Sequence, residues 1–230
     1  MNQTDRGSGQ QPGEDETIDE LDGGVRIIQG ARGYRYTSDS IDLAGFVKIK
    51  KGEKCADLGA GSGVITILLA KKHSGTEFTA IELQADEAGR LQRNISLNGL
   101  EERVGAVHAD LRRPNEIPGC GRFDLAFSNP PYRRKGSGRL SVKIDRAISR
   151  QEINLTISET VHAASRLLKN RGRFCLIYPA DRLVDLVCEL RSARLEPKRI
   201  AFISRGKRKA VKLAMVEALK GGGRGLIIII

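Results

Sequence analysis

Short apolar runs alternate with helical segments from about residue 52 onward. Apolar runs of five or six residues indicate buried strands, and apolar residues repeating every three or four positions indicate helices. One such helical stripe comprises Ile153, Ile157, Val161, Ala164 and Leu168. The pattern predicts strands at 54–58, 77–82, 104–109, 123–128, 173–178, 199–204 and 213–219, and further helices at 64–72, 84–97 and 183–191.

This alternation predicts an α/β fold with a mostly parallel sheet of seven strands and helices on both faces. The last two strands have no helix between them, so we expect them to form a C-terminal antiparallel hairpin. The final run, Leu226 followed by four isoleucines, suggests a truncated or edge element. We expect residues 25–230 to form a single domain.

The first part of the chain has a different composition. Residues 1–24 are rich in Gly, Gln, Asp and Glu and contain few apolar side chains, so we expect a disordered acidic tail. Two short strands are expected at 25–29 and 35–37. The segment Ser38-Asp39-Ser40 is typical of a helix N-cap, and the helix should extend to about Phe46.

The charge of the chain is concentrated outside this tail. The net charge is +11, although residues 1–22 contain seven acidic residues and only one arginine. Segments 133–150 and 191–212 contain seven and nine Lys/Arg residues, each with a single acidic residue. Such clusters are often merely solvated surface, but a body this basic favours a polyanionic partner, with nucleic acid preferred.

Several other classes of protein are disfavoured. The four cysteines are far apart and form no CxxC or Cys/His cluster, so we expect no metal site but buried thiols in a reducing cytoplasm. No apolar stretch approaches the roughly 18–20 residues of a membrane span. The acidic start does not resemble a secretory signal. The oligomeric state is left open.

The first candidate site follows the strand at 54–58. Asp57 precedes a glycine-rich turn, and Glu82 and Asp110 end the next two strands. Glycines let a backbone approach a ligand closely, and α/β sheets bind ligands at the carboxyl ends of their strands. Glu82 is placed to bind ribose hydroxyls and Asp110 to bind an adenine amino group. A nucleoside cofactor is therefore expected; a dinucleotide of a dehydrogenase, or a turn without ligand, is the alternative.

The second candidate site is Asn129-Pro130-Pro131-Tyr132, directly after the strand at 123–128. Proline fixes φ, so the turn holds the Asn129 side-chain oxygen and the Pro130 carbonyl rigidly. Two such acceptors can bind the hydrogens of a planar amine and localise its lone pair, while Tyr132 stacks on the base. A purely structural Asn-Pro turn is the alternative.

Together these motifs resemble those of the class I, Rossmann-like methyltransferases that methylate amino groups with S-adenosylmethionine. The segment Gly33-Tyr34-Arg35-Tyr36-Thr37-Ser38-Asp39-Ser40, and residues 133–138 after the turn, resemble bacterial tRNA(Val) adenine-N6 methyltransferases. The resemblance implies transfer of a methyl group to adenine N6 in RNA, next to the anticodon of a tRNA. It also implies that residues 25–50 form a lid over the cofactor.

Residue roles follow from the resemblance. It implies a catalytic turn of Asn129, Pro130, Pro131 and Tyr132. It implies cofactor contacts from Tyr36, Ser38, Asp39, Asp57, Leu58, Gly59, Ala60, Gly61, Glu82, Leu83, Asp110, Leu111 and Asn129. The basic clusters would bind RNA through Arg133, Arg134, Lys135, Arg139, Lys143, Arg205, Lys207, Arg208 and Lys209.

Other substrates remain open: an rRNA or DNA base, or a protein glutamine. Glutamine methyltransferases of release factors carry a separate helical domain before the cofactor loop, for which about thirty residues leave no room. A non-catalytic RNA-binding module would explain the charge but not Asn129 and the cofactor carboxylates.

Overall fold

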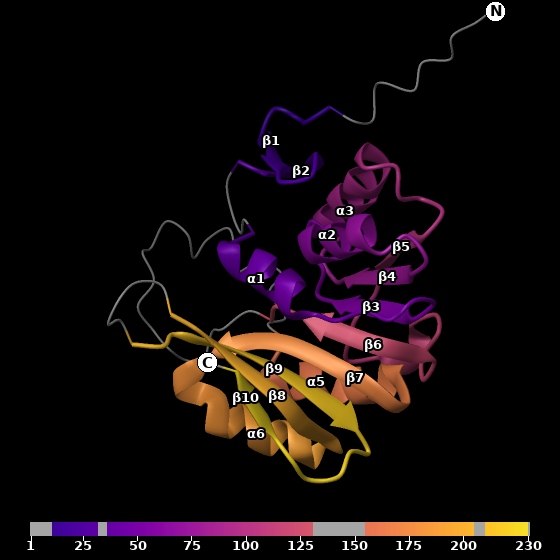
Figure 1. Ribbon diagram of the computed structural model, residues 1–230. Helices are drawn as coiled ribbons and strands as arrows, with labels where there is room; N and C mark the ends of the chain where they lie inside the picture. Colours follow the sequence, from indigo (N-terminus) through magenta and orange to yellow (C-terminus); the bar gives the residue numbers. More distant parts are fainter. Residues whose placement is uncertain (1–10, 32–35, 131–154, 205–209, 230) are drawn as a thin grey trace, which may run out of the picture.

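A central sheet organises the molecule (Figure 1). The computed structural model describes residues 11–31, 36–130, 155–204 and 210–229. In these residues the sheet has eight strands in the order β10-β8-β9-β7-β6-β3-β4-β5. The strands are β3 (Lys54–Leu58), β4 (Glu77–Glu82), β5 (Val104–His108), β6 (Phe123–Ser128), β7 (Leu168–Pro179), β8 (Leu195–Ile203), β9 (Leu213–Lys220) and β10 (Ile227–Ile229).

The pairing confirms the expected mixed sheet. Neighbours from β5 to β7 are parallel, whereas β9 runs antiparallel to both β7 and β8. The described sheet has one strand more than the seven predicted, because β10 pairs with the outer side of β8. The terminal isoleucines thus form an edge strand, and β7 and β8 are longer than their apolar runs indicated.

Helices cover both faces of the sheet (Figure 1). One core joins the sheet to the first three helices, and the other joins it to α5 and α6. Successive side chains of a strand point to opposite faces, so Cys55 belongs to the first core and Ala56 to the second. The helices are α1 (Ser38–Phe46), α2 (Val64–Lys72), α3 (Ala85–Leu97), α5 (Ile157–Leu167) and α6 (Leu183–Ser192), with 3₁₀ turns η1 (Pro114–Glu116) and η2 (Ala180–Arg182).

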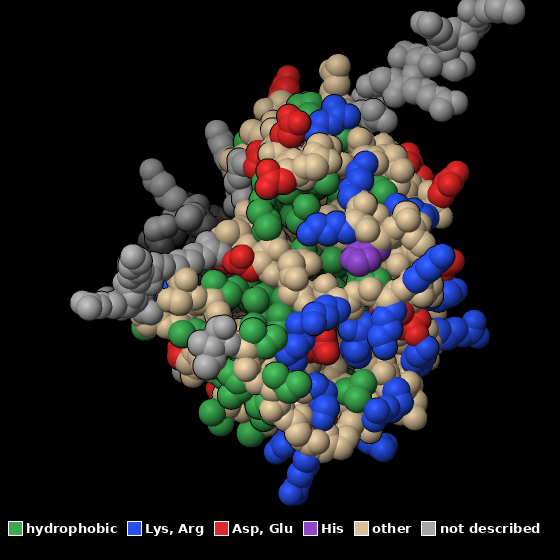
Figure 2. Space-filling model, in the orientation of Figure 1, with side chains coloured by type: hydrophobic (Ala, Val, Ile, Leu, Met, Phe, Trp, Pro, Cys, Tyr) green, Lys and Arg blue, Asp and Glu red, His purple; other side chains and the backbone are tan. Residues whose placement is uncertain are grey.

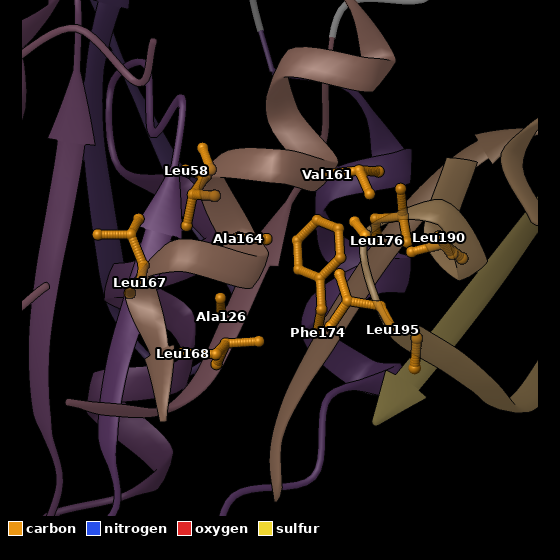
Figure 3. Packing of buried hydrophobic residues seen from close by; sticks show 14 of the residues in the cluster. Leu58, Ala126, Val161, Ala164, Leu167, Leu168, Phe174, Leu176, Leu190 and Leu195 are labelled. Carbon is orange, nitrogen blue, oxygen red and sulfur yellow. The ribbon is translucent and has the colours of Figure 1, made fainter. Parts of the chain in front are cut away.

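The second core is built around Phe174 of β7, whose side chain is fully buried (Figure 3). The helix α5 that covers it begins with a capping box, in which Thr156 and Glu159 bind each other's backbone N–H groups. The predicted stripe on Val161 and Ala164 lies in this core. Ile153 lies outside the described residues, and Leu168 already begins β7.

The prediction of a disordered tail over residues 1–24 is wrong for part of that segment. Residues 16–21 form β1 (Glu16–Leu21), which pairs antiparallel with β2 (Val25–Gly30). Both Arg90 and Arg93 of α3 contact the Glu16 carboxylate, and their hydrogen bonds lower its pKa to about 2. These ion pairs fasten the hairpin to α3, an effect that local composition does not reveal.

The expected strand at 35–37 is also not found in its described part. Tyr36 and Thr37 lie outside any strand, and Thr37 is the N-cap residue of α1. The partner of β2 is β1 instead.

No helix within the described residues is long and apolar enough to cross a membrane.

Candidate functional site

The glycine-rich turn folds onto the end of the neighbouring strand β4. The N–H groups of Gly59 and Ala60 donate to the Ile81 carbonyl at 3.0 and 2.9 Å. Gly61, with φ of 55°, donates its N–H to Glu82 at 2.8 Å. A glycine accommodates this left-handed backbone without strain. The turn is therefore held by the strand that carries the second candidate carboxylate.

Gly63 is favoured by its packing as well as by its backbone angle. Its φ is 87°, and a Cβ atom there would lie 2.4 Å from Cδ1 of Leu91 in α3. The Asn94 side chain, also in α3, donates to the Ser62 carbonyl at 2.9 Å. Helix α3 thus packs against the turn on the side of the first core.

Asp57 ends β3 as a buried carboxylate. Its side chain is 1% exposed, and Oδ2 accepts a hydrogen bond from Thr66 Oγ1 at 2.7 Å. Oδ1 is buried and has no hydrogen-bond partner among the described residues. Burial raises the pKa of Asp57 to about 7, with a smaller contribution from the charge of Glu82 and against the effect of the Thr66 hydrogen bonds.

Glu82 is almost as buried, at 7% exposed. Its carboxylate accepts three backbone N–H groups, from Gly61 at 2.8 Å, Leu83 at 2.9 Å and Gln84 at 2.8 Å. Burial raises its pKa, and these hydrogen bonds act in the opposite direction. A carboxylate offers roughly four acceptor positions. The three N–H groups fix its orientation and leave capacity for a ligand hydroxyl.

Asp110 differs from the other two carboxylates. It follows β5, and its two oxygens accept hydrogen bonds from the Arg112 guanidinium, which holds its pKa below the usual range. Leu111 beside it is buried in the second core. Arg112 was not anticipated from the sequence, in which it is one of many basic residues.

Asn129 follows β6 directly and lies beside the glycine-rich turn. Asp57 is in register with Phe127 of β6, and Ser128 Oγ donates to the Leu58 carbonyl at 2.7 Å. The strand ends that carry Asp57 and Asn129 are therefore adjacent at one edge of the sheet. Pro130 is buried, while Pro131 and Tyr132 lie outside the described residues.

The Asn129 side chain is oriented by helix α1. Its Nδ2 donates to Ser40 Oγ at 3.1 Å, and Ser40 is 6% exposed. Sequence reasoning missed Ser40, which it treated only as part of a helix N-cap, and also missed Thr66. Their spacing from their partners, 89 and 9 residues, carries no sequence signal.

The segment predicted to form a lid, residues 25–50, is described except for residues 32–35. The Tyr36 hydroxyl donates to Asp19 Oδ2 at 3.2 Å, and Gln29 Nε2 donates to the same oxygen at 2.5 Å. Ser38 and Asp39 form the first turn of α1. The nine expected RNA-binding residues, Arg133, Arg134, Lys135, Arg139, Lys143, Arg205, Lys207, Arg208 and Lys209, all lie outside the described residues.

A family match covers this site. The profile described as "Methyltransferase small domain" matches residues 40–182, from Ser40 through the glycine-rich turn and Asn129 to η2. The chain belongs to the methyltransferase small domain family. Membership in a methyltransferase family excludes the dehydrogenase alternative.

Two curated relatives have similar levels of sequence identity to this chain. A tRNA1(Val) (adenine(37)-N6)-methyltransferase of Shewanella halifaxensis is 28% identical over 177 residues, which are 76% of this chain and 71% of the relative. Its namesake in Porphyromonas gingivalis is 29% identical over 167 residues, 72% of this chain and 65% of the relative. The chain thus spans about two thirds of the length of these relatives.

Solved structures show the same fold. A predicted O-methyltransferase from Agrobacterium tumefaciens is 20% identical with a TM-score of 0.67, covering 83% of this chain and 84% of that one. The TYW2 protein of M. jannaschii, solved in complex with AdoMet, is 18% identical with a TM-score of 0.60, covering 91% and 87%. These likenesses support the Rossmann-like methyltransferase fold predicted from the sequence.

Proposed function

We propose that this protein transfers a methyl group from S-adenosylmethionine to the exocyclic N6 amino group of an adenine in tRNA, beside the anticodon. One observation carries the proposal: the buried carboxylates around the glycine-rich turn and the Asn129 amide lie on adjacent strand ends at one edge of the sheet. A cofactor held by the former would present its reactive group next to the latter.

The residues of the turn fit a cationic nucleoside cofactor. Asp57 Oδ1 is buried with no partner among the described residues. A Cβ at Gly59 or Gly61 would meet nothing within 4 Å, so the front of the turn is an open cradle. Asp57, Gly59 and Gly61 would hold the methionine part of the cofactor. Glu82 would bind its ribose, and Asp110 and Leu111 would contact its adenine. Tyr36, Ser38 and Asp39 would cover the bound cofactor.

S-adenosylmethionine supplies an electrophilic methyl group on a positively charged sulfur. The protein's task is to prepare the amine, whose lone pair is delocalised into the adenine ring. The Asn129 oxygen and the Pro130 carbonyl accept its two hydrogens, and so localise the lone pair. Because the Asn129 Nδ2 group donates to Ser40, the Oδ1 atom of the same amide points away from Ser40. Catalysis here is placement rather than strong general base chemistry.

The proposal of an RNA substrate rests on the named relatives and on the positive net charge of the chain. The relatives are tRNA1(Val) (adenine(37)-N6)-methyltransferases, and the chain carries a net charge of +11. A base in an anticodon loop is already single-stranded, so little energy is needed to bring it into a pocket. The substrate would be met in the cytoplasm.

Incubation with labelled S-adenosylmethionine and separate pools of tRNA, rRNA, DNA and protein tests the proposal. We expect label in tRNA only, recovered as N6-methyladenosine by nucleoside mass analysis. Tandem mass spectrometry of tRNA fragments then locates the modified position. Label in protein glutamine, or in a different RNA class, would refute the proposed substrate, and no label in any pool would refute the reaction.

A further inference from the structure

The edge of the sheet opposite the candidate site carries two basic hollows. One, of about 500 Å³, lies where β8 begins and β9 ends, and is lined by Arg191, Arg194, Glu196, Gly221, Gly222 and Arg224. The other, of about 610 Å³, lies where β3, β6 and β7 begin. Its basic lining residues are Lys50, Lys51, Lys169, Arg171 and Arg173. Lys and Arg side chains gather over this lower right part of the molecule (Figure 2).

Acidic neighbours neutralise only part of this charge. Lys169 pairs with Asp124, Arg173 with Glu53, and Arg191 with Glu196. The remaining basic residues of the two hollows have no ion pair within the described part of the chain: Lys50, Lys51, Arg171, Arg194 and Arg224. All five are exposed. The surface therefore has an excess of positive charge that the fold itself does not use.

Backbone conformation singles out two of these arginines. Arg171, with φ of 64°, and Arg194, with φ of 61°, are the only described non-glycine residues with positive φ. One lines each hollow. Glycine occupies such a backbone conformation without strain, whereas a residue with a Cβ does not. Strained residues that persist point to a function for the side chain.

At Arg194 the hydrogen bonds of the local structure involve only the backbone. Arg194 N–H donates to the Arg191 carbonyl, and the Arg194 carbonyl accepts from Gly221 N–H. The guanidinium groups of Arg171 and Arg194 make no hydrogen bond that the described residues record. Glycine would adopt these backbone angles with less strain, so what arginine adds at both positions is its charged side chain.

We propose that the two hollows form a second contact surface for RNA, which binds backbone phosphates far from the target base. The inference rests on the proposed function and extends it. The planar guanidinium groups match phosphate geometry. A hollow can receive a phosphate group that protrudes from an RNA backbone. A membrane presents a flat surface, which fits a hollow less well. A strand of six residues spans roughly 20 Å, so the RNA must extend well beyond a single loop to contact both edges.

The test replaces both strained arginines by glycine, with a charge-preserving control. For the double variant Arg171→Gly/Arg194→Gly we expect Kd for full-length tRNA to rise about tenfold, and the slope of log Kd against log salt to fall by about two. The double variant Arg171→Lys/Arg194→Lys keeps the charge and the backbone strain but not the planar guanidinium groups, so it should keep the wild-type salt slope and lose less affinity than the glycine variant. The thermal midpoint of the glycine variant should equal or exceed that of the wild type.

A short anticodon hairpin separates this inference from the proposed function. The glycine variant should methylate such a hairpin at the wild-type rate and bind S-adenosylmethionine equally well, because neither contact involves this edge. Wild-type affinity and salt slope of the glycine variant for full-length tRNA would overturn the inference while leaving the methyl transfer intact. Loss of binding to phosphatidylserine vesicles with unchanged tRNA binding would overturn it in favour of a membrane surface. Absence of methylation by the wild type of both the hairpin and full-length tRNA would refute the proposed function alone.

Discussion

The two edges of the central sheet differ in the charge and in the burial of their side chains: one carries buried carboxylates and the other carries exposed basic residues. At the carboxyl edge, Asp57 and Glu82 are buried and bound by hydroxyl or backbone N–H groups. At the amino edge, Arg171 and Arg194 are exposed, and their guanidinium groups make no hydrogen bond or ion pair that the described residues record.

The difference matches two kinds of ligand. A small cofactor needs a few groups held in fixed positions before it arrives, because only preorganised contacts avoid the cost of ordering on binding. A polymer with a charge at every residue needs many adaptable contacts, whose strength depends on salt. The same sheet can therefore serve a small ligand at one edge and a long one at the other. Mutations at the first edge should affect chemistry and cofactor affinity and be nearly insensitive to salt.

The largest expected effect is at the turn after β6. Asn129→Ala removes the acceptor proposed to bind the amine, and should lower kcat by about 10²–10³-fold, the typical cost of removing one positioned catalytic hydrogen-bonding group. S-adenosylmethionine binding measured by calorimetry should change much less. A loss of affinity as large as the loss of kcat would make Asn129 a cofactor-binding residue instead.

Next in size is the carboxylate at the end of β4. Glu82→Ala should weaken S-adenosylmethionine about 100-fold and abolish the rise in melting temperature that the cofactor causes, because charge-assisted hydrogen bonds of about 2–3 kcal/mol are lost. Glu77→Ala is the matched control. That residue begins the same strand at the opposite edge and pairs with Lys54 on the surface. If both variants weakened binding equally, the position of the site at the carboxyl edge would be wrong.

Ser40→Ala tests how the Asn129 amide is held. Loss of one hydrogen bond of about 1 kcal/mol should lower kcat by roughly five- to tenfold and leave the cofactor Kd unchanged. Ser40→Thr keeps the hydroxyl and should restore most of the rate. A Thr variant as slow as the Ala variant would indicate that packing of α1, rather than the hydrogen bond, sets the rate.

An effect no larger than that of Ser40→Ala concerns pH. The pKa of Asp57 in the free protein is raised to about 7. A cationic ligand favours the ionised carboxylate, so binding releases a proton and affinity rises as pH increases through 7. The cofactor Kd at pH 6 should be up to about tenfold weaker than at pH 8. Asp57→Asn removes the titrating group and should flatten this profile; an unchanged profile would assign the pH dependence to another residue.

Much of the fold could be predicted because its signals are local. The strands at 54–58, 77–82 and 123–128 have the predicted bounds, since each is a short, mostly apolar run with a clear end: Gly59 follows the first, Glu82 ends the second, and Asn129-Pro130 follows the third. β1 was missed because its sequence, ETIDEL, is acidic, and its stability comes from arginines of α3. The length of β7 was missed because residues 168–172 read as the end of a helix stripe and a turn.

The sequence by itself determined the order of strands and helices, the glycine-rich turn, and the Asn-Pro-Pro-Tyr motif after a strand. These features depend on residues within a few positions of one another, where backbone preferences and apolar spacing act directly. Only the tertiary structure decided that Ser40 orients Asn129, that a Cβ at Gly63 would collide with Leu91, and that Lys and Arg residues from four separate segments share one edge. Those contacts join residues far apart in the chain, and their distances follow from strand order and helix packing rather than from any local pattern.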